Sequence, residues 1–87
     1  MSKGNNHLKI NDMKEKILII GRPGMGKTDL ANMLSELMNY GLVEEVPSAQ
    51  WLSLNAEPGK VYVSNSITRA EATVYLRNFT VIAVSNL

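Results

Sequence analysis

One short stretch of the chain has residue types and a spacing that could bind phosphate. The stretch is ILIIGRPGMGKTDL, in which a glycine, four residues, a second glycine, a lysine and a threonine follow one another. Backbone N–H groups of a glycine-rich loop can surround a phosphate chain, and the lysine and the hydroxyl can reach its outer phosphates and Mg²⁺. The pattern predicts a nucleotide site made by Gly21, Arg22, Pro23, Gly24, Met25, Gly26, Lys27 and Thr28.

Each residue type in this stretch suits one part of that task. Gly24 and Gly26 let the backbone approach a ligand closely and adopt angles that are costly for other residues. Pro23 has no N–H, so we expect it at the outer bend of the loop. Lys27 would reach the β- and γ-phosphates, and the Thr28 hydroxyl would be the metal ligand.

The segments on either side fit a strand and a helix. The continuous apolar run KILII, from Lys16, predicts a strand that is buried on both faces and ends at Gly21. From Lys27, apolar residues recur every three or four positions, which predicts a helix to about Asn39. The phosphate would then lie at the positive end of that helix.

The rest of the chain predicts an α/β fold. KVYVSN and TVIAVSNL indicate strands, and ITRAEATVYLRNF indicates a helix with Ala70, Val74 and Leu76 to Phe79 on its apolar face. Thr68 and Glu71 have the spacing of a capping box at the start of that helix. Ser48 is expected to cap a short helix that carries Trp51. The predicted fold class is a small three-layer domain, with a parallel sheet of three clear strands flanked by helices.

Length and composition narrow the class of protein. With 87 residues, we expect a flexible tail over 1–14 and a single domain over 15–87. The net charge of +1, with lysine and arginine scattered, gives no nucleic-acid signal, and the lone His7 is expected to be solvated. There is no cysteine, signal peptide or membrane span, so the expected location is cytoplasmic, with no membrane contact.

The stretch GRPGMGKT resembles the Walker A loop of the P-loop NTPase superfamily, in the form common in AAA-type ATPases and related helicase loaders. The resemblance implies a P-loop-type sheet and ATP or GTP with Mg²⁺, held by Lys27 and Thr28. The last strand also resembles the sensor strand of AAA-type proteins, which would make Ser85 or Asn86 the residue that faces the γ-phosphate.

The chain departs from the superfamily pattern in its acids. Members of the superfamily usually have a carboxylate at a strand end near the Mg²⁺, whereas KVYV ends in Ser64 and Asn65. An asparagine brings no negative charge and cannot act as a base. No Walker B acid is identified, and the catalytic residues are unknown.

The remaining acids each have a more ordinary explanation. Asp29 is expected to be a first-turn acid favoured by the helix dipole, and Glu71 a capping residue. Glu57 falls in a turn. Glu44 and Glu45 follow an apolar run that is too short for a convincing strand.

Four other residues are expected to be structural or solvated. Arg69 and Arg77 could reach a phosphate, but exposed helix arginines are usually solvated. Trp51 and Tyr62 could stack on a nucleotide base, but a place in the core is expected for each.

Three hypotheses for the function follow. The first is a minimal P-loop protein that binds ATP or GTP, with weak or partner-dependent NTPase activity at most. The second is a non-catalytic P-loop-fold interaction protein, for instance a phage or plasmid factor that binds a host protein. The third is a pared-down relative of nucleoside monophosphate kinases. An exposed sheet edge could serve a homo-oligomer or a protein partner.

Overall fold

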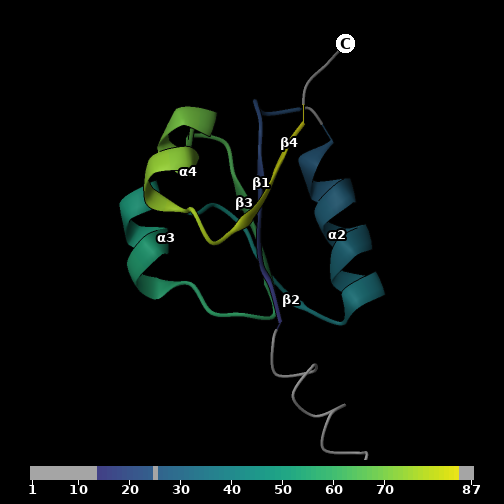
Figure 1. The fold of residues 1–87 in the computed structure, drawn as a ribbon. Coiled ribbons are helices and arrows are strands. Elements are labelled where there is room, and N and C mark those ends of the chain that lie inside the picture. Colours follow the sequence, from purple (N-terminus) through teal and green to yellow (C-terminus); the bar gives the residue numbers. More distant parts are fainter. Residues whose placement is uncertain (1–13, 25, 85–87) are drawn as a thin grey trace, which may run out of the picture.

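The computed structural model describes residues 14–24 and 26–84, and its elements alternate between strand and helix. In chain order they are β1 (Lys16–Ile20), α2 (Lys27–Met38), β2 (Gly41–Val43), α3 (Ala49–Asn55), β3 (Lys60–Ser64), α4 (Arg69–Tyr75) and β4 (Thr80–Ala83) (Figure 1). The α/β class predicted from the sequence is confirmed. The expected tail over 1–14 lies outside the described residues except for Lys14.

The four strands form one parallel sheet in the order β2-β3-β1-β4. β1 lies in the interior, with Leu18 opposite Tyr62 of β3 on one side and Val81 of β4 on the other. Because all strands run the same way, their carboxyl ends meet at one edge of the sheet. The glycine-rich loop follows β1 and therefore lies at that edge.

Helices cover both faces of the sheet, so the domain has three layers. Figure 1 shows α2 on one side of the strands and α3 and α4 on the other. Alternate side chains of β1 serve the two cores: Leu18 and Ile20 pack with α3 and α4, while Ile17 and Ile19 pack with α2. All four are at most 3% exposed, as expected for a central parallel strand.

β2 is a fourth strand, and the expectation that the run before Glu44 was too short for one is wrong. Gly41 to Val43 pair in parallel with Lys60 to Tyr62 of β3. β2 is a three-residue edge strand whose Leu42 and Val43 are only half-buried. Its sequence therefore has neither the length nor the alternation by which strands are recognised.

Both short helices are capped as the sequence predicted. The Ser48 side chain accepts a hydrogen bond from the Trp51 N–H at the start of α3. At α4, the Thr68 hydroxyl accepts from the Glu71 N–H, and the Glu71 carboxylate accepts from the Thr68 N–H. Among the described residues, none of the helices combines the length and the apolar composition that a membrane span requires.

The buried face of α4 differs in part from the expected one, because Leu76 is buried as expected but Val74 is not. Ala72 and Leu76 are 3% and 1% exposed, whereas Val74 is 65% exposed. Residues two apart on a helix point about 200° apart, so the pairs at 70/74 and 72/76 form two competing apolar stripes. The cap at Thr68 fixes where the helix begins, and Leu76 then reaches the core beside Ile67.

We expect Thr68→Ala to lower the free energy of unfolding by about 1 kcal/mol, because it removes the hydroxyl that accepts a hydrogen bond from the Glu71 N–H. Chemical denaturation in urea measures the change. Thr73→Ala is the matched control, since Thr73 is exposed on the same helix and bonds only to the Arg69 carbonyl. A loss as large in the control would contradict the assigned role of the cap.

Candidate functional site

The loop between β1 and α2 uses backbone angles that favour glycine. Gly24 and Gly26 each have a φ of 80°, in the left-handed region. A Cβ at either position would meet nothing within 4 Å, so their open side faces free space. Pro23 and Gly24 form the turn of the loop, as expected for the outer bend.

Glycine is required at position 21 because the backbone of Val84 approaches it closely. A Cβ built there would lie 2.7 Å from the Val84 carbonyl oxygen, and φ is 153°. The Val84 N–H in turn donates to the Ile20 carbonyl at 2.8 Å. The start of the loop is thus held against the end of β4 by backbone atoms that have little room to move.

The loop ends at a helix N-terminus with no side-chain cap. Gly26 is the N-cap of α2 and makes no side-chain capping bond, whereas Ser48 and Thr68 cap α3 and α4. The first N–H groups of a helix have no partner within the helix, and the helix dipole makes this end positive. The N-terminus of the 12-residue α2 therefore has backbone donors available for an anion.

Lys27 is a buried cation at this helix end. It is 5% exposed, and its Nζ donates a hydrogen bond to the Arg22 carbonyl oxygen across the loop. It has no carboxylate partner in the part of the chain that the structure describes. Lysine is almost never buried to this extent without a counter-charge, so the position suits a residue that meets an anion.

A cavity of about 490 Å³ opens beside the loop, above the carboxyl ends of the strands. Its loop side is lined by Pro23, Gly24, Gly26, Lys27 and Thr28. The rest of its lining comes from Asp29 of α2, from Glu44 and Glu45 after β2, and from Val63 and Asn65 at the end of β3. β1 and β3 are neighbours that lead to helices on opposite faces, and this divergence is where open α/β sheets bind ligands.

The structure brings carboxylates to this cavity, against the expectation that no acid lay in place. Glu44 and Glu45 follow β2, whose partner β3 lies next to β1. Glu45 has a φ of 60°, an uncommon angle for a residue other than glycine. The chain turns there, and the side chain of Val46 is buried just after the turn. The Val46 backbone N–H donates a hydrogen bond to the Val63 carbonyl oxygen.

Ser64 and Asn65 have different places at the end of β3. Ser64 is 1% exposed, and its hydroxyl accepts hydrogen bonds from the N–H groups of Ser66 and Ile67, each at 3.1 Å. It therefore holds the turn into α4. Asn65 lines the cavity together with residues of the glycine-rich loop.

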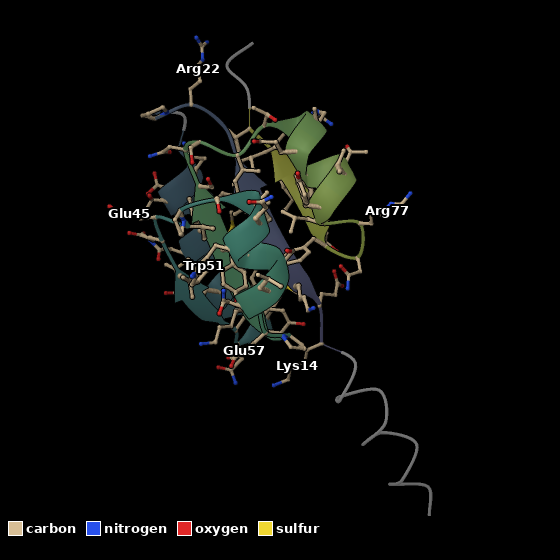
Figure 2. The ribbon with its side chains drawn as sticks, turned by 90° about the vertical axis from the view of Figure 1, so that its left-hand side faces the viewer. Lys14, Arg22, Glu45, Trp51, Glu57 and Arg77 are labelled. Atoms are coloured by element: carbon tan, nitrogen blue, oxygen red, sulfur yellow. The ribbon has the colours of Figure 1, made fainter. Side chains whose placement is uncertain are left out.

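The other candidate residues lie away from the cavity. Tyr62 belongs to the core as expected, 3% exposed, with its hydroxyl accepting from the Glu57 N–H. Trp51 was expected in the core but is 40% exposed on α3. Figure 2 shows Arg22 projecting upward from the top of the domain, and Arg77 on the side opposite Glu45. Arg69 lines a second hollow with Arg77.

The site holds no preformed metal centre among the residues that the structure describes. No three acidic or histidine side chains there are close enough together to ligate one ion by themselves. Three residues of the predicted site and sensor strand, Met25, Ser85 and Asn86, lie outside the described residues.

The fold and the loop together define an α/β protein with a four-stranded, all-parallel sheet, compatible with a P-loop-like fold. Comparison with protein-family models, with curated proteins and with solved structures finds no match for this chain.

Proposed function

We propose that this chain is a minimal member of the P-loop NTPase superfamily and binds ATP or GTP with Mg²⁺ through the loop from Gly21 to Thr28. One observation carries the proposal: the cavity combines the uncapped N-terminus of α2 with the buried, carboxylate-free cation of Lys27. Both attract anions, and they lie on one wall. A triphosphate is the ligand that the loop sequence favours.

The residues present fit such a ligand. The open sides of Gly24 and Gly26 leave space for phosphate oxygens, which a Cβ at either position would reduce. Lys27 would exchange its bond with the Arg22 carbonyl for phosphate oxygens. The Thr28 hydroxyl lines the same wall and would hold the metal ion.

The acidic wall fits a hydrated divalent cation. Asp29 of α2 and Glu44 and Glu45 after β2 line the cavity, and carboxylate and hydroxyl oxygens are the ligands that Mg²⁺ prefers. When bound, the ion would neutralise part of the triphosphate charge. Without it, these acids would repel the nucleotide.

We propose that turnover by the chain alone is weak or depends on a partner. The acids come from the β2 edge and α2, and Asn65, at the end of the strand next to β1, supplies no charge. A carboxylate at that central position is what the chain lacks for efficient hydrolysis.

Titration of the purified chain with fluorescent ATP and GTP analogues tests the proposal. In the presence of Mg²⁺, we expect saturable binding in the micromolar range, displaced by the unlabelled nucleotide. The proposal would be overturned if no nucleotide bound, or if inorganic triphosphate failed to displace the bound nucleotide. A site that holds a nucleotide by its phosphates should also bind inorganic triphosphate.

A second prediction concerns the acidic wall. In the double variant Glu44→Gln/Glu45→Gln, the gain in nucleotide affinity that Mg²⁺ provides should fall by about tenfold, since each lost carboxylate removes roughly 0.7 kcal/mol of charge interaction. Titrations with Mg²⁺ and with EDTA measure the gain. Glu57→Gln, which removes an exposed acid away from the cavity, is the control. An unchanged gain in the double variant would show that the two glutamates do not face the metal–phosphate group.

A further inference from the structure

β4 is an edge strand of the sheet and has no fully buried residue. All four core residues of β1 are at most 3% exposed, whereas Val81, Ile82 and Ala83 of β4 are half-buried. β4 pairs with β1 on one side only, and no described residue pairs with its other side. Parallel strands are normally covered on both faces, whereas β4, like the other edge strand β2, is only partly covered.

The outer edge of β4 offers backbone hydrogen-bonding groups. The Val84 N–H donates to β1, at the Ile20 carbonyl. Because the direction of these groups alternates along a strand, the N–H and C=O groups of Val81 and Ala83 point away from β1. A further extended chain can pair with them, as in recognition by strand addition.

A hollow of about 380 Å³ lies alongside this edge, between β4 and α4. Leu76, Phe79 and Val81 give it an apolar lining. Arg69 and Arg77 lie at its two ends, at the start of α4 and just after it. Neither arginine has a carboxylate within 4 Å among the residues that the structure describes.

The spacing of the two arginines matches a simple strand pattern. α4 rises roughly 9 Å from Arg69 to Tyr75, and Arg77 lies two residues beyond the end of the helix. In a strand, residues i and i+4 lie on one face and are roughly 13 Å apart. An acidic residue at each of these positions would reach one arginine, and an apolar residue at i+2 would enter the hollow.

We propose that the edge formed by β4 and the hollow beside it bind an extended acidic segment of another protein, with acids at i and i+4 and an apolar residue at i+2. The charge of the hollow argues against a second copy of this chain. Pairing of two β4 edges across a twofold axis would bring Arg69 and Arg77 of both copies together. The inference does not depend on nucleotide binding.

NMR titration of the ¹⁵N-labelled chain tests this proposal with two blocked nine-residue peptides. The first has the sequence Thr-Val-Glu-Thr-Val-Thr-Glu-Val-Thr, and the second has lysine in place of both glutamates. We expect the acidic peptide to bind with a sub-millimolar Kd, to protect the Val81 and Ala83 amides from hydrogen exchange, and to bind at least tenfold more tightly than the lysine peptide.

Charge reversal gives the matched control. Arg69→Glu/Arg77→Glu should reverse the preference between the peptides, while Lys14→Glu, which changes an exposed cation remote from Arg77 (Figure 2), should leave it unchanged. Saturating Mg²⁺-ATP should not displace the acidic peptide. Three results would overturn the proposal: equal binding of the peptides, no binding at about 5 mM, or a dimer in which Val81 and Ala83 are protected without peptide.

Discussion

Lys27→Ala should weaken binding of the Mg²⁺-bound nucleotide by about 100-fold. The variant removes a cation that is 5% exposed and lies on the cavity wall, where charge interactions with phosphate are screened little by water. A loss of this size corresponds to about 2.7 kcal/mol, within the range of a hydrogen bond between charged groups. Titration with a fluorescent ATP or GTP analogue measures it.

Lys60→Ala is the control for this variant. Lys60 is a half-buried cation at the start of β3, at the end of the sheet opposite the loop, and it pairs with Glu57 at 3.6 Å. Its removal should change nucleotide affinity less than twofold. Thermal unfolding of both variants shows whether they are folded. Equal affinities of the two variants would mean that Lys27 does not contact the ligand.

Gly21→Ala should lower the free energy of unfolding by about 3 kcal/mol. The new Cβ would lie only 2.7 Å from the Val84 carbonyl oxygen, and the φ of this position is unfavourable for alanine. The clash is with backbone, and Val84 is held by its bond to Ile20. For a domain of this size, the melting temperature should fall by about 15 °C. Urea denaturation and calorimetry measure both quantities.

Gly24→Ala separates the two causes of that loss. Gly24 also has a positive φ, but a Cβ there would have no neighbour within 4 Å. This variant should lose only about 1 kcal/mol, the cost of the backbone angle alone. If both variants lost the same amount, the close approach of the loop to β4 would not be what requires glycine at position 21.

The parts of the fold with strong local patterns could be predicted. The apolar run of β1 and the three- and four-residue spacing of α2 fix a strand and a helix around the loop. The capping residues Ser48 and Thr68 fix where two short helices begin. Each of these features depends on residues close in sequence, which is why the sequence was sufficient.

The parts that depend on distant contacts could not be predicted. β2 is stabilised by pairing with β3, and its three residues carry no pattern of their own. Which stripe of α4 is buried depends on the sheet, because Val74 and Leu76 are both apolar. Trp51 has an apolar side chain that no described part of the domain fully covers.

The candidate site shows the same division. The loop itself could be predicted from Gly21 to Thr28, but the rest of the cavity lining could not. Glu44 and Glu45 reach the cavity only because β2 pairs with β3 and β3 pairs with β1. A glutamate with a left-handed φ at a strand end, as at Glu45, is visible only in the structure.

Binding of nucleotide phosphates by the loop at the start of α2 can be tested residue by residue. Its most direct test is an NMR titration of the ¹⁵N-labelled chain with Mg²⁺-ATP and Mg²⁺-GTP. We expect saturable shifts in the micromolar range at the amides of Gly24, Gly26, Lys27 and Thr28, with little change at Val81 and Ala83. No shift at these loop amides up to about 5 mM of either nucleotide, or shifts confined to another surface, would contradict it.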